Sequence, residues 1–314
     1  MKAVSVGDIL IDFNPLGVDE FGYPSIQAQP GSDVGNFLAA MRKFGSEAEF
    51  IGKIGDDTFG HLLLKTLREN GIGTGGVVVS GDTFTTLGFV TLDASGDRDF
   101  SFMHAADVEL AFDEINLSIL ENADVLHFST VSMTDEPART AIKKLVEYAK
   151  AKGILISFDP NLRKTLWADL DDCKAQMLWG LSVADVIKIG DEEIDFLFTL
   201  GPEAGAEKIL SDTGASLVYA TCGAKGCFYK SRNAGGFVPS LSGIKVIDTV
   251  GAGDIFGGSA MWKLLSLGKS PAEVTAEELR EVVSFATAAA GLSTTKHGGM
   301  TSVPSLEEIA IVKG

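Results

Sequence analysis

The chain has 314 residues, of which 45% are hydrophobic, and its 26 Lys and Arg against 43 Asp and Glu give a formal net charge of −17. The apolar fraction supports a packed core and excludes a disordered chain. The acidic balance argues against a nucleic-acid surface or an anionic membrane as partner. At about 150 residues per domain, the length predicts two units or one large α/β domain.

The first third of the chain predicts strand–helix pairs followed by a hairpin. We expect a strand over 3–11, a turn-rich stretch over 13–30, a helix over 34–44, a strand over 47–53, a helix over 58–70 and a strand over 77–80. From residue 83 the pattern changes. Residues 85–93 and 98–104 read as two strands joined by turn residues 94–97, which indicates a hairpin.

The rest of the chain alternates strands and helices. Strands are expected over 123–130, 154–159, 184–190, 216–223, 227–231 and 244–250, and helices over 137–153, 173–182, 192–200, 254–267 and 276–293. Such alternation predicts a mainly parallel sheet covered by helices on both faces, an α/β/α sandwich. We assign residues 1–12, 31–82 and 106–314 to this core. Residues 13–30 and 83–105 are expected to form one small β-sheet outside the main layer, which we interpret as a lid.

Cysteine usage and the apolar runs bear on the compartment. Cys173, Cys222 and Cys227 lack disulfide or zinc spacing, so reduced structural thiols are expected. The first apolar run is too short, and meets an acidic residue too soon, for a signal peptide. No stretch approaches the about 18 apolar residues of a membrane span. We expect a cytoplasmic protein.

The segment 244–267 is the most informative part of the sequence. Gly251-Ala252-Gly253-Asp254 stands between an expected strand and an apolar helix, where backbone N–H groups and the helix dipole can hold an anion. A carboxylate at Asp254, beside a transferring phosphoryl group, suits the base that takes a hydroxyl proton. On this segment alone, Asp254 could equally be a helix cap and the glycines could serve only close packing.

Other phosphate-binding motifs are absent or in the wrong context. The sequence contains no P-loop and no protein-kinase motif set. Residues 71–76 match G-x-G-x-x-G, but they follow a helix and precede a strand, so we interpret them as a helix stop and turn. Gly251 and Gly253 have the right order for a dinucleotide fingerprint but lack its third glycine. A nicotinamide-dependent dehydrogenase is therefore disfavoured.

Four further segments place polar residues after expected strands. Asp12 ends the first strand, residues 31–36 open a helix, residues 159–163 follow a strand with a guanidinium, and residues 221–226 follow another strand. Each alone has an ordinary explanation as a turn, cap or surface ion pair. Together they predict a ligand site at the carboxyl ends of the strands, where open α/β sheets bind ligands.

With these motifs the chain resembles the ribokinase-like, pfkB-type carbohydrate kinase family, and within it the fructokinases. DTVGAGDIFGG (248–258) is similar to its C-terminal signature and FIGKIGDDTFG (50–60) to its N-terminal signature region. GDILIDF, DRDFSF, FDPNLRKTLW, TCGAKG and STTKHGG extend the resemblance over essentially the whole chain. The resemblance implies a helix-covered sheet with a β lid over the sugar. It also implies ATP-dependent phosphorylation of a sugar hydroxyl with Mg²⁺ and often K⁺.

The resemblance also implies roles for matching positions. Asp254 would be the general base, Gly251, Ala252 and Gly253 the anion hole, and Arg163 a group that stabilises the sugar or the transferring phosphate. The implied sugar contacts are Asp12, Gly31, Ser32, Asn36, Phe100, Arg163 and Asp254. The implied nucleotide contacts are Lys188, Thr221, Gly223, Gly226, Thr249, Gly251, Gly253 and Thr287. The implied metal ligands are Glu193 for Mg²⁺ and the oxygen-rich set Asp248, Val250, Thr294, Gly299 and Ser302 for a monovalent cation.

Three departures from the family pattern concern specificity. The usual pair of glycines that opens the helix is Gly31-Ser32 here, followed by Asp33, which could add a hydroxyl contact or point away. The N-x-x-E motif linked to Mg²⁺ becomes G-D-E-E over 190–193, with Glu193 retained. Thr287 stands where Asn or His commonly faces adenine.

We therefore expect a sugar kinase that acts on a terminal hydroxyl of fructose, with 2-keto-3-deoxygluconate or ribose as alternatives. A catalytically silent sugar-binding relative is the hypothesis of a different class. Sugar and ATP are the expected partners, and an exposed lid strand favours a homodimer through the lid. Of the four histidines, which we interpret as structural, His104 in the lid is the one to test.

Overall fold

A nine-stranded sheet forms the middle of the molecule. The computed structural model describes residues 1–92 and 98–313, and the side chains of residues 91–100 fall outside that description. In spatial order the strands are β13 (Gly235–Pro239), β12 (Gly226–Ser231), β11 (Leu217–Thr221), β10 (Val186–Gly190), β9 (Leu155–Asp159), β8 (Val125–Ser129), β1 (Lys2–Val6), β4 (Glu47–Gly55) and β5 (Gly73–Ser80). All neighbours pair in parallel except β11 with β12 and β12 with β13. The parallel strands therefore end at one common edge.

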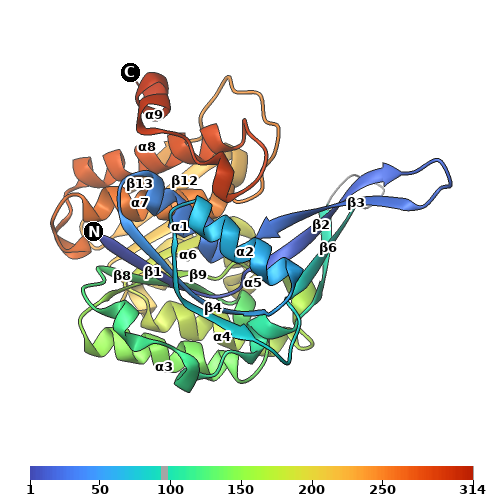
Figure 1. Ribbon diagram of the computed structural model, residues 1–314. Coiled ribbons are helices and arrows are strands. Elements are labelled where there is room, and N and C mark those ends of the chain that lie inside the picture. The colour runs from blue at the N-terminus through green and yellow to red at the C-terminus, as the bar shows by residue number, and fades with distance from the viewer. Residues whose placement is uncertain (93–97, 314) are drawn as a thin grey trace.

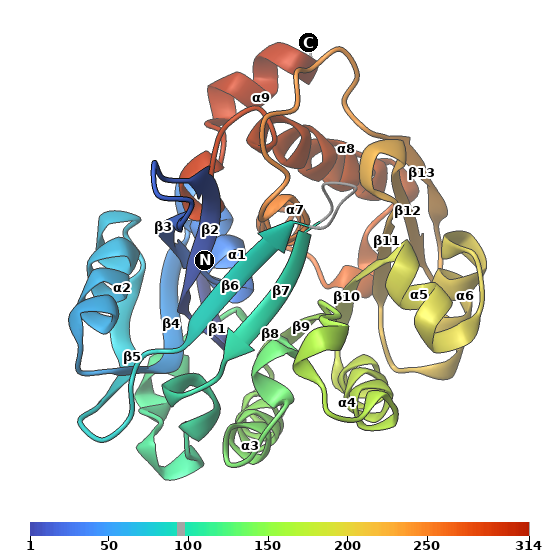
Figure 2. The same ribbon diagram turned by 90° about the vertical axis from the view of Figure 1, so that its right-hand side faces the viewer.

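Helices cover both faces of this sheet (Figures 1 and 2). One face carries α1 (Asp33–Lys43), α2 (Thr58–Glu69), α7 (Ala252–Leu265) and α8 (Ala276–Ser293), with α9 (Leu306–Lys313) packed on α8. The other carries α3 (Ala138–Ala151), α4 (Leu170–Val183), α5 (Asp191–Phe198) and α6 (Pro202–Asp212). Each face has its own apolar core, as a parallel sheet requires. The expected α/β/α class is confirmed.

A second, four-stranded sheet projects from the sandwich (Figure 1). Its order is β3 (Pro24–Gly31), β2 (Leu10–Val18), β6 (Leu87–Leu92) and β7 (Arg98–Met103). β2 pairs antiparallel with β3 and parallel with β6, and β6 pairs antiparallel with β7. The separate small sheet expected from the sequence is therefore present. The expected hairpin turn 94–97 lies outside the described residues, and the domain boundaries stay a prediction.

The single strand expected over 3–11 is wrong, because the chain changes sheets at Gly7–Ile9. Strand β1 ends at Val6 in the large sheet and β2 starts at Leu10 in the small one. The carbonyl of Asp8 accepts the hydroxyl of Ser32 at 2.6 Å, which holds the break against the start of α1. The run 3–11, which contains Ser5, Gly7 and Asp8, is thus divided between two sheets.

The turn-rich stretch expected over 13–30 is a long hairpin of β2 and β3. Proline is tolerated there because β6 pairs with β2 only from Ile11 to Phe13, so Pro15 interrupts no second ladder. The register shifts between Pro15 and Gly17, as in a bulge. The hairpin forms the far end of the projecting sheet (Figure 1).

The strand expected over 244–250 is absent. The backbone N–H groups of Ile247 and Asp248 instead donate to the carbonyl of Thr294 at 2.7 and 3.1 Å. The segment is therefore a loop tied to the end of α8, and α7 starts two residues earlier than expected, at Ala252.

The elements α6, β13 and α9 lie where the sequence predicted neither an α-helix nor a strand. The paired strands expected over 216–231 are confirmed as β11 and β12. Residues 71–76 close α2 and begin β5, with Gly71 at φ 71°, so their interpretation as a helix stop is confirmed. Within the described ranges, no helix has the length and apolar character needed to cross a membrane.

Candidate active site

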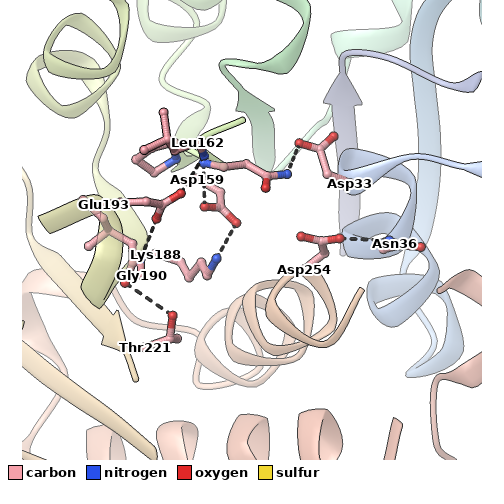
Figure 3. A network of polar contacts seen from close by, with 12 residues as sticks. Asp33, Asn36, Asp159, Leu162, Lys188, Gly190, Glu193, Thr221 and Asp254 are labelled. Atoms are coloured by element: carbon pink, nitrogen blue, oxygen red, sulfur yellow. Dashed lines mark hydrogen bonds and ion pairs between the residues drawn. The ribbon is translucent and has the colours of Figure 1, made fainter. Parts of the chain in front are cut away.

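Polar side chains gather where β1, β9 and β10 end and α1 and α7 begin (Figure 3). They come from segments distant in sequence. Asn36 and Asp254 form one hydrogen-bonded pair, and Asn161 and Asp33 another. Lys188 and Asp159 form an ion pair beside them. This is the strand edge at which the sequence predicted a ligand site.

The start of α7 is shaped by glycine. Gly251 has φ 73°, a left-handed conformation that a side chain strains. A Cβ atom there would lie 2.8 Å from Nδ2 of Asn36 and 3.1 Å from Cα of Gly299. The N–H of Ala252 donates to the carbonyl of Thr249 at 3.3 Å. Because a helix N-terminus carries partial positive charge, this junction suits an anion, and the anion hole of Gly251, Ala252 and Gly253 stays a prediction.

Asp254 lies in the first turn of α7, and one of its carboxylate oxygens accepts from Nδ2 of Asn36 at 2.8 Å. Burial and the nearby Asp33 carboxylate raise the pKa of Asp254 to about 6, while Lys188, the Asn36 hydrogen bond and Arg163 act in the opposite direction. The group is therefore ionised at neutral pH, with a pKa close enough to accept a proton efficiently. Asp254 is not a helix cap, because Gly251 occupies that position.

Lys188 lies between the α7 start and the end of β9. Its Nζ donates to Asp159 at 2.9 Å, and a Cβ atom at Gly253 would lie 3.1 Å from the same nitrogen. Burial lowers the pKa of Lys188, but the carboxylates of Asp159, Glu193 and Asp254 outweigh burial and raise it above the ordinary value. A permanent cation is thus fixed beside the anion-binding helix end.

Asp12 lies on the small sheet, aligned across the strands with Gly88 of β6, which in turn pairs with Phe102 of β7. Added Cβ atoms at Gly31 and Gly88 would both collide with the Asp12 carboxylate, so both glycines are needed for its position. Phe13, on the opposite face of β2, stacks on Phe89 and meets Phe59 of α2. Asp12 therefore occupies the face turned away from α2.

A second carboxylate–amide pair lies next to Asp254. Oδ2 of Asp33 accepts from Nδ2 of Asn161 at 2.6 Å. Asn161 is buried and has φ 47°, which is uncommon for a residue other than glycine. Asp8, also buried, has a pKa raised well above its ordinary value by burial and by the charge of Asp33, to which it is hydrogen-bonded. Asp33 therefore points into the polar network and not away from it.

The predicted residues on the nucleotide side lie around the ends of β10 and β11. The hydroxyl of Thr221 donates to the carbonyl of Ile189 at 3.4 Å. Gly223 and Gly226 bound the turn into β12, both with positive φ, and the backbone of Val238 and Pro239 leaves no room for a Cβ at Gly226. Thr287 is buried on α8, and its hydroxyl has no hydrogen-bond partner within the described part of the chain.

Glu193 is buried and both of its carboxylate oxygens meet backbone N–H groups. Oε1 accepts from Leu162 at 2.7 Å and Oε2 from Gly190 at 2.5 Å. The side chain therefore joins the loop after β9 to the start of α5. No group of three or more His, Cys, Asp or Glu side chains in residues 1–92 and 98–313 is arranged to hold a metal.

The residues predicted for a monovalent cation meet at one loop. Asp248 accepts from the N–H groups of Val250 and Gly298, both at 3.1 Å, and the carbonyl of Thr294 faces the same segment. The Ser302 hydroxyl is buried and donates to the carbonyl of Gly299 at 2.8 Å. The loop is rich in carbonyl and carboxylate oxygens, the donors that a hard cation requires.

Phe100 and Arg163 were also predicted to contact the sugar. The side chain of Phe100 lies outside the described residues. Arg163 is exposed, and its NH1 donates to the carbonyl of Leu162 at 3.2 Å. Its positive charge acts to lower the pKa of Asp254.

The sequence alone assigned no role to three residues of this polar network. Asp8 follows the first strand, and Asp159 and Asn161 belong to the segment 159–163, in which only Arg163 was assigned a role. His104 also has a specific partner. Its Nδ1 lies 2.8 Å from Asp107, whose buried carboxylate raises the pKa of the imidazole against the effect of burial.

A mainly parallel, helix-covered sheet with a separate small sheet beside its strand edge is the ribokinase-like fold, which is found in sugar kinases. The family model for pfkB family carbohydrate kinases matches residues 1–306, and the chain belongs to this family. Fructokinase-1 of Zea mays is 37% identical over 318 residues, covering 98% of this chain and 95% of that protein.

Solved structures agree with this family. Fructokinase from Xylella fastidiosa with bound ATP has a TM-score of 0.90 at 28% identity, covering 99% of this chain and 97% of that one. A double mutant of the Vibrio cholerae O395 fructokinase, in a form with fructose, ADP and potassium ion bound, has a TM-score of 0.86 at 27% identity, covering 99% and 97%.

Proposed function

We propose that this protein is an ATP-dependent fructokinase that transfers the γ-phosphoryl group of ATP to a terminal hydroxyl of fructose. The observation that carries the proposal is the Asn36–Asp254 pair in the first turn of α7. It joins a fixed proton acceptor to an anion-binding helix end. The full-length similarity to Fructokinase-1 of Zea mays supports fructose as the acceptor.

In the proposed reaction Asp254 takes the proton of the acceptor hydroxyl. The sugar oxygen forms a bond to the γ-phosphorus as the bond to the β-phosphate oxygen breaks, and ADP leaves. The α7 N-terminus, through Gly251 and Gly253, faces the charge on the transferring group. Lys188 and Arg163 supply the nearby positive charge, and Asp12, Gly31, Ser32 and Asn36 line the acceptor side.

The phosphates of ATP must be bound against a net charge of −17. We propose that Mg²⁺ accompanies ATP, since it binds mainly through substrate phosphates and needs no protein cage. Glu193 would act on it through the loop that it orders, because both of its oxygens already accept amide protons. The oxygens of the Asp248 loop fit K⁺, which would hold the segment entering α7 in place. When bound, Mg²⁺ neutralises charge on the phosphates.

The small sheet would act as the lid. Its outer hairpin exposes Leu16, Val18, Phe21, Tyr23 and Ile26 by 67, 71, 75, 68 and 50%. Exposed apolar side chains on an unpaired edge suit a second copy of the same sheet, and we propose a homodimer through the lids. Sedimentation of the wild type and of Phe21→Asp tests it. A monomeric wild type would remove this part of the proposal.

Cys173, Cys222 and Cys227 are free and buried. They support the proposal of a reducing, cytoplasmic location. Fractionation of the source cells, with the protein recovered outside the cytoplasm, would contradict it.

The activity is tested by ADP release with ATP, Mg²⁺ and a panel of fructose, ribose and 2-keto-3-deoxygluconate, with and without K⁺. The proposal requires fructose-dependent turnover that collapses in Asp254→Asn. Sugar binding without turnover would indicate the silent relative, and faster turnover of ribose or 2-keto-3-deoxygluconate would reassign the substrate.

A further inference from the structure

Asp33 is held in one orientation by groups on two sides. Its Oδ1 accepts from the N–H of Val34 at 2.5 Å and its Oδ2 from Nδ2 of Asn161 at 2.6 Å. Asn161 makes this contact from a buried position, with its backbone at a left-handed φ of 47°. Strained backbone is usually retained where it positions a functional group.

Capping α1 does not require this carboxylate. Ser32 is the N-cap of α1, and its hydroxyl oxygen accepts from the N–H of Gly35 at 2.8 Å. Asp33 is also no part of the apolar core. It is only half-buried, and it lies on the face of α1 that carries Asn36. In Figure 3 Asp33 lies on the same side of the polar network as the Asn36–Asp254 pair.

The charge around Asp33 selects what can bind beside it. Asp8 is buried, and burial and the negative charge of Asp33 raise its pKa well above the ordinary value. Asp254 lies next to Asp33, and Lys188 is engaged by Asp159. A neutral donor is favoured at this position, whereas another anion meets like charges.

We propose that Asp33 is a specificity-determining residue of the acceptor site, where its carboxylate accepts a hydrogen bond from a hydroxyl of a neutral sugar and rejects sugars that carry a carboxylate there. The inference rests on the proposed kinase function and deepens it by naming the substrate class. Asp33 thereby favours fructose or ribose over 2-keto-3-deoxygluconate.

The first test compares kcat/KM for fructose and for 2-keto-3-deoxygluconate in the wild type, in Asp33→Asn and in Asp33→Ala. Asp33→Asn removes the charge and keeps the shape. Losing a charged hydrogen bond in the site lowers kcat/KM for fructose about tenfold or more, mainly through KM. The preference for fructose over the acid falls by at least the same factor. Asp113→Asn, on an exposed position, is the control and keeps the wild-type ratio.

The second readout is the pH profile of kcat with fructose. The charges that face Asp254 are Asp33 from α1, Lys188 from β10, Asp159 from β9 and Arg163 from the loop that follows β9. Because Asp33 raises the pKa of Asp254, Asp33→Asn shifts the acid limb of the profile to lower pH. A role confined to folding would lower the melting temperature without moving this limb.

An unchanged sugar ratio in Asp33→Asn, or a wild type that prefers the sugar acid, overturns the inference. If ribose is phosphorylated and fructose is not, fructose is the wrong substrate, and the comparison of ribose with the acid decides the role of Asp33. If no sugar is turned over, calorimetric titration of the same sugars into the wild type and Asp33→Asn decides it. Absence of all sugar binding contradicts both proposals.

Discussion

The proposed phosphate side and the proposed sugar side of the candidate active site differ in the chemical groups that they offer to a ligand. On the phosphate side the structure offers backbone, namely the α7 start at Gly251 and Gly253, with one ion-paired lysine, Lys188. On the sugar side it offers side-chain carboxylates, each fixed by a neighbour, as Asn36 fixes Asp254. Backbone amides hold an anion without adding charged residues to an acidic protein. Carboxylates suit the hydroxyl groups of a neutral sugar.

Removal of divalent metal is the largest expected effect on the phosphate side. Since few protein cations face the phosphates, we predict that turnover with ATP and fructose is abolished by EDTA and restored by excess Mg²⁺. ADP release across a range of free Mg²⁺ measures this dependence. Full turnover in the presence of EDTA would show that the protein alone neutralises the phosphates and would break the comparison.

Asp254→Asn tests the sugar side at its proton acceptor. An amide cannot take the hydroxyl proton, so kcat should fall by about 10³-fold while KM for both substrates stays within a few fold. Steady-state kinetics measure both parameters, and Asp113→Asn serves as the control for loss of an exposed carboxylate. A variant that keeps most of the wild-type kcat would assign the base to another residue.

Gly251→Ala tests whether the backbone at the α7 start has the proposed role. Alanine is strained at the positive φ of Gly251, and its Cβ atom would press on Asn36 and Gly299. We therefore expect kcat/KM for ATP to fall by about 10²-fold. Gly268→Ala is a matched control, because Gly268 also has positive φ but an added Cβ atom would meet nothing within 4 Å. Equal losses in the two variants would reduce the effect to backbone strain.

The pH dependence is the smallest effect predicted. The pKa of Asp254 is raised to about 6, and only its ionised form accepts a proton. We therefore expect kcat to fall as the pH is lowered through about 6, to about a tenth of its plateau one unit below. Initial rates from pH 5 to 8 measure this limb, and a flat profile over that range would contradict the assignment.

Much of the site followed from motif and spacing, because its residues stand just after strands or at helix starts. Asp254 and Asn36 are brought together as that pattern implies, and Lys188, which only the family resemblance implied, lies beside them. The parallel order of the strands also followed from their alternation with helices. These features depend on local sequence and on the common edge that parallel strands share.

What the sequence did not reveal depends on tertiary contacts. The change of sheets at Asp8 depends on Ser32, and the lost strand at 244–250 depends on the carbonyl of Thr294. The orientation of Asp33 depends on Asn161, which lies 128 positions further along the chain. No window of neighbouring residues carries such information.

The division between a backbone phosphate side and a carboxylate sugar side is tested most directly by calorimetric titration. A non-hydrolysable ATP analogue and fructose are each titrated into the wild type, Gly253→Ala and Asp12→Asn. An added Cβ atom at Gly253 would meet Lys188, on the phosphate side. We predict a crossed result, in which Gly253→Ala weakens the nucleotide and spares fructose, and Asp12→Asn weakens fructose and spares the nucleotide. Equal loss of both ligands in both variants would contradict the division.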